Sequence, residues 1–349
     1  MRAVVVEEFG VLPVVKEVAA PACPPDGVVV RVTATGVCRS DWHGWQGHDS
    51  DVTLPHVPGH ELAGVVEAVG ADVWSWAVGD AVTVPFVCAC GTCAACRAGE
   101  QQVCERQTQP GFTHDGSFAE LVALDHADVN LVRLPAGMSP VTAAGLGCRF
   151  ATAYRAVTVH GRVRAGDPVA VHGCGGVGLS AVMVAVAVGA RVVAVDVSES
   201  ALAAASDLGA HAVVQVRAGE SAESVAARVH ELTGGGAAVS LDALGAVATA
   251  TASVLSLRRR GRHVQVGLLL GADTAPPLPM GRVIAWELEL YGSHGMAAHE
   301  YPAMLARIAS GELDPSRLVG RTIGLDEAPA ALAALGEGGT GPGMTVVVP

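Results

Sequence analysis

The pattern of hydrophobic and polar positions changes near Pro140. Before it, short apolar, β-branched runs alternate with turns that are rich in glycine and proline. Such runs favour β-strands, which we predict at 28–34, 62–69 and 81–87. The first part of the chain is therefore predicted to form an irregular, β-rich domain.

After Pro140, apolar strand-like runs alternate with apolar helix-like runs, a pattern that is typical of a parallel sheet. We predict strands at 169–171, 191–195, 212–216, 239–241, 263–266, 288–292 and 344–348, and helices at 142–158, 178–188, 201–208 and 301–310. The pattern changes again near Trp286. The chain is thus expected to divide into residues 1–150, 151–285 and 286–349, with an α/β, doubly wound parallel sheet in the middle part.

Composition and charge limit the classes of function. Half of the 349 residues are hydrophobic and only 16% are charged, which predicts a well-folded protein. The net charge of −12 argues against nucleic acid or an anionic membrane surface as the main partner. We interpret the basic run Arg258-Arg259-Arg260 as a solvated helix end or loop and not as a binding patch.

Neither a membrane span nor an export signal is predicted. Residues 169–190 carry no Asp, Glu, Lys or Arg, but five glycines and His172 interrupt them, which favours a buried strand, turn and helix. Glu7 and Glu8 come too early for the apolar core of a signal peptide. The nine cysteines, an odd number, are expected to be reduced, and we predict a cytoplasmic protein.

A glycine-rich turn follows the strand predicted at 169–171 and precedes a helix. Gly173, Gly175 and Gly178 have the G-x-G-x-x-G spacing, and Gly176 and Val177 complete the turn. In this context the glycines allow a tight turn, close approach of a pyrophosphate and close packing of helix on strand. The helix N-terminus would supply N–H groups to the phosphates. The turn therefore predicts a dinucleotide site, with a glycine-rich turn of another α/β protein as the alternative.

Asp196 lies 18 residues after Gly178, at the end of the second predicted strand. A carboxylate at this place accepts hydrogen bonds from the adenosine ribose. It would repel a ribose 2′-phosphate, and residues 197–201 offer no Arg or Lys to bind one. We therefore predict NAD and not NADP.

Four closely spaced cysteines, Cys90, Cys93, Cys96 and Cys104, can surround one Zn²⁺ tetrahedrally. Because all four ligands would be protein side chains, this would be a structural site. An iron–sulfur cluster and metal-free thiols are the alternatives. A zinc ribbon that touches nucleic acid is a further one, which the acidic charge and the glycine turn oppose.

Three more candidates, Cys38, His60 and Cys148, are dispersed, and their spacing alone does not join them. The run Gly59-His60-Glu61-x-x-Gly64-x5-Gly70-x-x-Val73, the four cysteines and the glycine turn resemble the zinc-dependent medium-chain alcohol dehydrogenases over nearly the whole chain. The resemblance implies that residues 1–150 and 286–349 form a GroES-like catalytic domain, with a structural zinc lobe at about 88–106. Residues 151–285 would form a Rossmann-type dinucleotide-binding domain.

The resemblance also implies roles for single residues around a catalytic zinc. Cys38, His60 and Cys148 match the three zinc ligands and leave a fourth position for water or substrate. Glu61 matches a carboxylate that can approach the metal during ligand exchange. Asp41 matches an acid that orients the zinc-bound histidine.

Other matches concern the substrate and the cofactor. Ser40 matches the hydroxyl that contacts the substrate oxygen, and His43 matches the outer end of a proton relay. Arg39 matches a pyrophosphate-binding position. Phe86 matches a wall of the substrate pocket, and Trp45 is a second candidate for a wall.

The implied function is reversible, NAD-linked oxidation of an alcohol to an aldehyde or ketone, with two zinc ions per chain and a homodimer or homotetramer. A polyol or another hydroxylated metabolite is the alternative substrate, although Cys148 stands where the polyol-oxidising branch has Glu. A zinc-free quinone reductase of the same fold would lack Cys38, His60 and Cys148. A catalytically silent relative is the last alternative.

Overall fold

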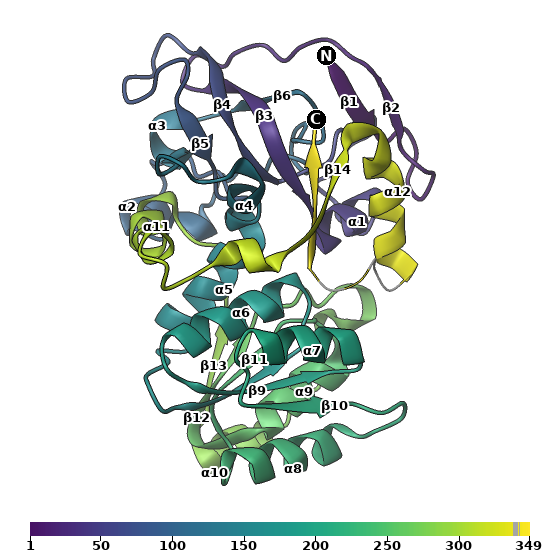
Figure 1. The fold of residues 1–349 in the computed structure, drawn as a ribbon, viewed down its shortest axis with the longest axis vertical. Coiled ribbons are helices and arrows are strands. Elements are labelled where there is room, and N and C mark those ends of the chain that lie inside the picture. Colours follow the sequence, from purple (N-terminus) through teal and green to yellow (C-terminus); the bar gives the residue numbers. More distant parts are fainter. Residues whose placement is uncertain (338–340, 342) are drawn as a thin grey trace. The chain divides into compact units, whose positions relative to one another are not determined.

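The computed structural model describes residues 1–337, 341 and 343–349. The chain forms two compact units (Figure 1). The first unit contains Met1–Ala151 and Gly295–Pro349, and the second contains Thr152–His294.

The second unit contains a parallel sheet whose strands, within the described residues, follow the order β10-β9-β8-β11-β12-β13. The strands are β8 (Pro168–His172), β9 (Arg191–Asp196), β10 (Ala212–Gln215), β11 (Ala237–Asp242), β12 (Leu257–Gln265) and β13 (Glu289–Gly292). The helices are α6 (Gly176–Ala187), α7 (Glu199–Asp207), α8 (Ala222–Thr233), α9 (Val247–Leu255) and α10 (Met280–Trp286). The chain starts in the middle of the sheet at β8, builds one half outward and then returns to build the other. This is the doubly wound order of dinucleotide-binding folds.

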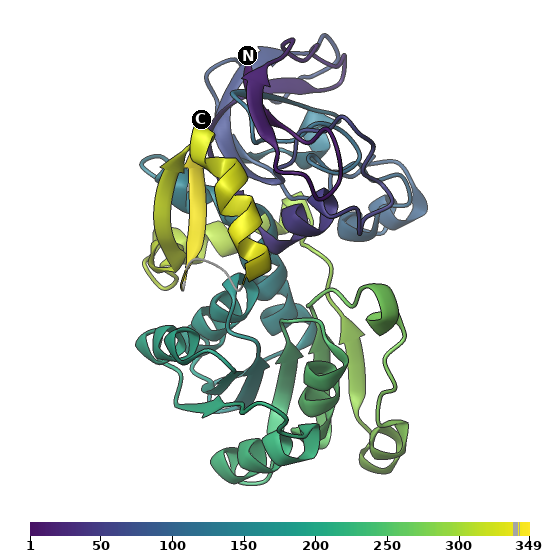
Figure 2. The ribbon, with the colours of Figure 1, turned by 90° about the vertical axis from the view of Figure 1, so that its right-hand side faces the viewer.

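The first unit is built around a mainly antiparallel sheet in the order β14-β15-β3-β4-β5-β7, with β6 also paired to β3. The strands of this unit are β1 (Arg2–Val5), β2 (Val14–Glu17), β3 (Val28–Val37), β4 (Glu61–Val69), β5 (Ala81–Thr83), β6 (Leu121–Leu124), β7 (Val132–Arg133), β14 (Val319–Gly324) and β15 (Met344–Val348). Of these, β1 and β2 pair with each other in a separate antiparallel sheet. The C-terminal segment, yellow in Figure 2, returns to this unit, where β15 pairs antiparallel with β3.

The helices of the first unit are short. They are α1 (Arg39–Trp45), α2 (Ala94–Arg97), α3 (Ala127–Asn130), α4 (Pro140–Ala144), α11 (Tyr301–Ala309) and α12 (Ala328–Ala334), and α5 (Ala151–Arg155) begins at the last residue of the unit's first segment. Single 3₁₀ turns are η1 (Gln101–Val103), η5 (Ala298–Glu300), η6 (Pro315–Leu318), η7 (Leu325–Glu327) and η8 (Leu335–Glu337), and η4 (Gly271–Thr274) lies in the second unit.

The structure differs from the expected organisation at several places. The helix predicted at 142–158 is interrupted by two wide π turns, η2 (Leu146–Phe150) and η3 (Ala156–His160), which flank α5. The strand predicted at 81–87 ends at Thr83, because Pro85 has no N–H for a ladder. The expected second boundary at 285/286 precedes β13, which pairs with β12 and so continues the sheet of the second unit.

The basic run Arg258-Arg259-Arg260 lies in β12 and not at a helix end or in a loop. The pairing with β11 is irregular here, and Arg260 has a positive φ of 59°. Arg260 pairs with Glu287 at 2.7 Å, and Arg258 lies 3.9 Å from Asp167. Acidic neighbours thus offset part of the positive charge of this run.

Two buried histidines lie inside the second unit. His172, at the end of β8, lies 3.3 Å from the Ser256 hydroxyl, and His263 on β12 lies 2.8 Å from the Ser253 hydroxyl. Burial lowers the pKa of His172 to about 3 and that of His263 to about 4. Both rings are therefore neutral in the folded protein at neutral pH.

We expect the second unit to lose stability as the pH falls from 6.5 toward 4. The folded pKa of both rings lies below the ordinary value of 6.5, so the unfolded chain binds protons that the folded chain excludes. Between pH 6.5 and 4.5, each ring should lower the free energy of unfolding by roughly 2–3 kcal/mol. Calorimetry of His172→Gln should show a shallower fall of Tm than wild type. The exposed His211→Gln is the control, and equal slopes for all three proteins would contradict the expectation.

Candidate active site and metal centres

Cys38, His60, Glu61 and Cys148 meet in the first unit. Each offers one ligand atom, and these four atoms lie within 4.8 Å of one another. Cys38 stands at the start of α1, His60 and Glu61 lie at the start of β4, and Cys148 lies in the π turn η2. The antiparallel pairing of β3 with β4 brings the first two segments together, with Gly36 opposite Glu61.

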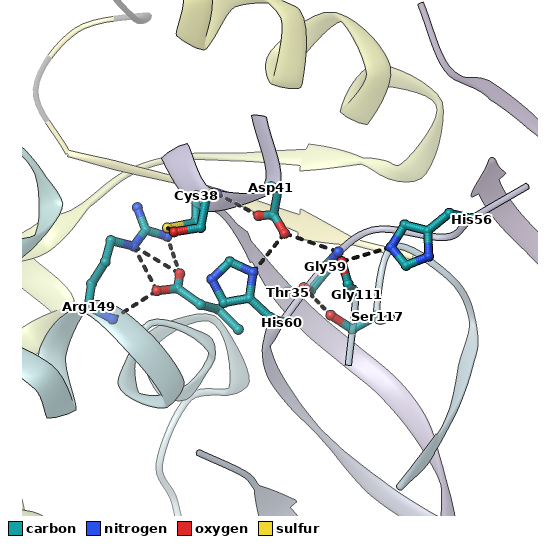
Figure 3. Close-up of polar contacts among 11 residues, drawn as sticks. Thr35, Cys38, Asp41, His56, Gly59, His60, Gly111, Ser117 and Arg149 are labelled. Atoms are coloured by element: carbon teal, nitrogen blue, oxygen red, sulfur yellow. Dashed lines mark hydrogen bonds and ion pairs between the residues drawn. The ribbon is translucent and has the colours of Figure 1, made fainter. Parts of the chain in front are cut away.

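Asp41 fixes the orientation of His60 (Figure 3). Its carboxylate lies 2.7 Å from Nδ1 of His60 and accepts hydrogen bonds from the backbone N–H groups of Cys38 at 2.9 Å and Gly59 at 3.1 Å. Both side chains are buried. Among the described residues, Nε2 of His60 is buried and has no hydrogen-bond partner. A metal ion is the partner that such a nitrogen, surrounded by thiols, would have.

The chemistry of this cluster fits zinc. Two thiols and one imidazole are the ligands that zinc prefers, and three such ligands leave an open position. A hydrogen bond from Cys148 is the main cause that keeps the pKa of the Cys38 thiol well below its usual value. The thiolate is the form that binds metal.

The second cluster contains Cys90, Cys93, Cys96 and Cys104, whose sulfur atoms also lie within 4.8 Å of one another. Cys93 begins α2 and accepts a hydrogen bond from the backbone N–H of Cys96 at 3.5 Å. The backbone N–H of Thr92 is the main cause that lowers the pKa of Cys90 to about 5. Four buried sulfur atoms fit a closed tetrahedral zinc site without a position for substrate.

Cys88 lies outside this cluster, as its spacing predicts. It is buried, lies 3.7 Å from the carbonyl oxygen of Pro85, and burial raises its pKa to about 12. Cys88 therefore behaves as a small core residue.

Ser40 and His43 both lie on α1. The Ser40 hydroxyl is 3.9 Å from the Cys38 sulfur, which places it beside the candidate metal site. Nδ1 of His43 is 3.0 Å from Nδ1 of His48. Burial, together with the nearby His48 and Arg39, lowers the pKa of His43 to about 4, so this ring is neutral at pH 7.

His48 is a candidate functional residue that the sequence reasoning missed. The helix α1 ends at Trp45, with Gln46 as its C-cap. Gly47, with a φ of 73°, then turns the chain so that the N–H of His48 reaches the carbonyl oxygen of His43 at 3.0 Å. The signal in the sequence is the glycine after a short helix, followed at once by a second histidine.

The two aromatic residues predicted as pocket walls, Phe86 and Trp45, lie in different surroundings. The Phe86 ring lies 6.2 Å from the His60 ring, and the Phe112 ring, which was not predicted, lies 5.3 Å from it. Trp45 instead belongs to a buried apolar core with Val4 and Phe118, and its indole N–H donates to the carbonyl oxygen of Val11 at 2.6 Å. The structure therefore places Phe86 and Phe112 next to the metal cluster, and Trp45 in a core.

Arg39 lies on α1 with its guanidinium 5.1 Å from the centre of the Trp42 ring. It also donates a hydrogen bond to the carbonyl oxygen of Leu335. These two contacts hold the guanidinium between the Trp42 ring and the carbonyl oxygen of Leu335.

The glycine turn between β8 and α6 is tightly packed at Gly178 and open at Gly175. A Cβ on Gly178 would lie 1.7 Å from the carbonyl oxygen of Gly173, whereas one on Gly175 would meet nothing within 4 Å. Gly175 is the N-cap of α6, which Gly176 and Val177 begin. An open N-terminus of this kind fits a phosphate group.

Asp196 lies at the end of β9, next to this turn. Its carboxylate accepts hydrogen bonds from the backbone N–H groups of Cys174 at 2.6 Å and Ser198 at 2.8 Å. The structure thus brings the predicted carboxylate and the predicted glycine turn into direct contact.

Two family models match the chain. "Alcohol dehydrogenase GroES-like domain" matches residues 24–136, and "Zinc-binding dehydrogenase" matches residues 176–310. An alcohol dehydrogenase of Geobacillus stearothermophilus is 40% identical over 298 residues, which are 84% of each chain. The chain belongs to the zinc-dependent medium-chain alcohol dehydrogenase family.

Further members of this family are similar over the full length. An NAD-dependent alcohol dehydrogenase of Sulfurisphaera tokodaii is 32% identical over an alignment of 363 residues, which covers 100% of each chain. The solved structure of the alcohol dehydrogenase of Aeropyrum pernix is similar with a TM-score of 0.89, 33% identity and full coverage of both chains. The predicted family and the predicted fold class, a Rossmann-type sheet with a GroES-like domain, are confirmed.

The charge-free segment at 169–190 forms β8, the glycine turn and α6 in the structure. Within the described residues, no helix is both long enough and apolar enough to cross a membrane.

Proposed function

We propose that the protein reversibly oxidises an alcohol to an aldehyde or ketone, with NAD as the hydride acceptor. The observation that carries this proposal is that Cys38 and Cys148 converge on His60, whose buried Nε2 has no hydrogen-bond partner in the part of the chain that the structure describes. These three side chains would hold zinc, which supplies a Lewis acid that lowers the pKa of the alcohol hydroxyl. Membership of a family of zinc-dependent alcohol dehydrogenases supports the same reaction.

The residues on α1 would move the proton that the alcohol loses. Ser40, beside Cys38, is placed to accept it. His43 is the outer acceptor, because its lowered pKa keeps the ring neutral and able to bind a proton. His48, hydrogen-bonded to His43, extends this path by one side chain toward solvent. Asp41 holds His60 in one orientation throughout.

The same proposal assigns the remaining predicted residues. The glycine turn, with Gly173, Gly175 and Gly178, would bind the pyrophosphate of NAD, and Asp196 the adenosine ribose. Arg39 would contact the pyrophosphate after release from its contact with Leu335. The four cysteines of the second cluster would hold a structural zinc.

An absorbance assay of NADH formation with a panel of alcohols tests the proposal. The panel contains primary alcohols, secondary alcohols and polyols, and we expect turnover with at least one of the first two classes. The aromatic rings of Phe86 and Phe112 beside His60 favour an apolar substrate. Turnover with polyols alone would replace the proposed substrate class. A protein that carries zinc and binds NADH but turns over no alcohol in the panel would be a silent relative.

Cofactor preference provides a separate prediction. We expect Asp196→Gly to raise KM for NAD⁺ and to narrow the NAD⁺/NADP⁺ preference by at least about tenfold, because hydrogen bonds to a charged group are lost and repulsion of a 2′-phosphate is relieved. Adding Val197→Arg to the Asp196→Gly variant should narrow the preference for NAD⁺ over NADP⁺ further. The measurement is kcat/KM for both cofactors. A wild type that prefers NADP⁺, or an unchanged ratio in the variant, would show that Asp196 is not the ribose carboxylate.

We further propose that the protein works in the cytoplasm as a homodimer or homotetramer. No disulfide joins the nine cysteines, all of which lie within the described residues, and this supports a reducing compartment. Ile284 and Met280 on α10 are 75% and 51% exposed, and exposed apolar residues of this kind support a contact between subunits.

A further inference from the structure

Glu61 is held by an arginine that follows directly after a metal-ligand candidate. Nε of Arg149 lies 2.9 Å from each carboxylate oxygen of Glu61, and its backbone N–H donates to Oε1 at 3.0 Å. A terminal nitrogen of the guanidinium forms a further bond to Oε2. The Glu61 side chain is completely buried, and that of Arg149 is 11% exposed. Figure 3 shows Arg149 on the opposite side of this cluster from Asp41.

The surrounding backbone is shaped for this ion pair. Gly36 on β3 lies directly against it, and a Cβ there would be 2.4 Å from Oε2 of Glu61 and 2.7 Å from a guanidinium nitrogen of Arg149. The π turn η2 contains both Cys148 and Arg149, so one wide turn presents a sulfur ligand and the guanidinium side by side. Such turns occur often at functional sites.

Glu61 therefore lies between the Arg149 guanidinium and the place that a metal ion would take. One of its oxygens is within 4.8 Å of the ligand atoms of Cys38, His60 and Cys148, and carboxylate oxygen is itself a zinc ligand. A buried carboxylate needs a charged partner, because an unpaired one is strongly destabilising. Arg149 and a metal ion in the cluster would thus compete for the same carboxylate.

We propose that Arg149 is a positioning residue that holds Glu61 away from the catalytic metal and so keeps the fourth ligand position open. The inference rests on the proposed metal site. Without the guanidinium, Glu61 would turn to the metal as a fourth ligand. The metal would then leave more slowly, and an external ligand would bind more weakly.

The test compares Arg149→Met, the conservative Arg149→Lys and the double variant Arg149→Met/Glu61→Gln. Cobalt is exchanged into the catalytic site, and imidazole binding is followed by the visible spectrum of the metal. A chromogenic chelator measures the release of catalytic zinc, which is identified as the zinc that Cys38→Ser lacks. Neither readout depends on turnover.

We expect Arg149→Met to weaken imidazole binding about tenfold or more and to slow zinc release, within the range of effects known for side chains that support metal ligands. Arg149→Lys, which keeps the charge but not the forked contact, should give a smaller change in the same direction. The double variant should return both properties to near wild type, because Gln competes poorly for the metal. If Arg149→Met does not fold, Arg149→Lys alone tests the proposal, by weaker imidazole binding and slower zinc release than in wild type.

Unchanged imidazole binding in every arginine variant that folds would overturn the proposal. Faster release of catalytic zinc from Arg149→Met than from wild type would overturn it as well. A wild type with no catalytic zinc would instead contradict the proposed function and, with it, the role of Arg149. The two failures are thus distinguishable by the zinc content of the wild type.

Discussion

Replacing Cys38 with serine is expected to remove the catalytic zinc and to lower kcat/KM by about 10³-fold or more, since the Lewis acid supplies several kcal/mol to the reaction. Cys38 is one of the two sulfur ligands of this cluster, and the thiolate is the form that binds a metal ion. The hydroxyl of serine lacks this anionic character at neutral pH. The glycine turn lies in the other unit and has no residue in common with the cluster, so NADH binding should persist.

The control for this prediction is Cys23→Ser. Cys23 is a free, half-buried cysteine outside both clusters, and its variant should keep two zinc ions and full turnover. Zinc content, NADH fluorescence and kcat/KM are measured on the same samples. Wild-type turnover in a Cys38→Ser protein that has lost one zinc would refute the catalytic role of this site.

The second large effect is expected from Cys96→Ala in the four-cysteine cluster. Cys96 supplies one of four buried sulfur atoms, which alanine lacks, whereas alanine keeps the backbone N–H that bonds to Cys93. A closed metal site contributes its binding energy directly to folding. If several kcal/mol are lost, Tm should fall by about 10 °C or more, given the usual 2–4 °C per kcal/mol for a unit of this size.

The matched control here is Cys88→Ala, because Cys88 is also buried and near in sequence but is not one of the four. It should keep both zinc ions and lose only the packing of one sulfur atom. Activity of Cys96→Ala should disappear with unfolding and not at temperatures below it. An unchanged Tm with one zinc fewer would mean that the cluster does not stabilise the fold.

The sequence predicts best where the chemistry is local. The glycine turn was predictable because strand, turn and helix are consecutive, and Asp196 follows at a fixed distance. The four cysteines were predictable for the same reason. Cys38, His60 and Cys148 could be joined only through the resemblance to a family, since the pairing of β3 with β4 and the π turn η2 bring them together.

The residues that the sequence missed depend on such turns. His48 faces His43 only because Gly47 adopts a positive φ. Arg149 meets Glu61 only because a wide turn interrupts the helix predicted at 142–158. Trp45 was predicted as a wall of the substrate pocket because it lies close in sequence to the relay residues, but its ring packs in an apolar core. Periodicity describes which face is buried, but not which buried groups meet.

The measurement that tests the central claim most directly is the zinc content of the purified wild-type chain, determined by native mass spectrometry. Each of the two clusters fits one ion, so the account predicts two zinc ions per chain, with one lost in Cys38→Ser. A wild-type chain with one zinc ion or none, or a Cys38→Ser chain that keeps both, would contradict it.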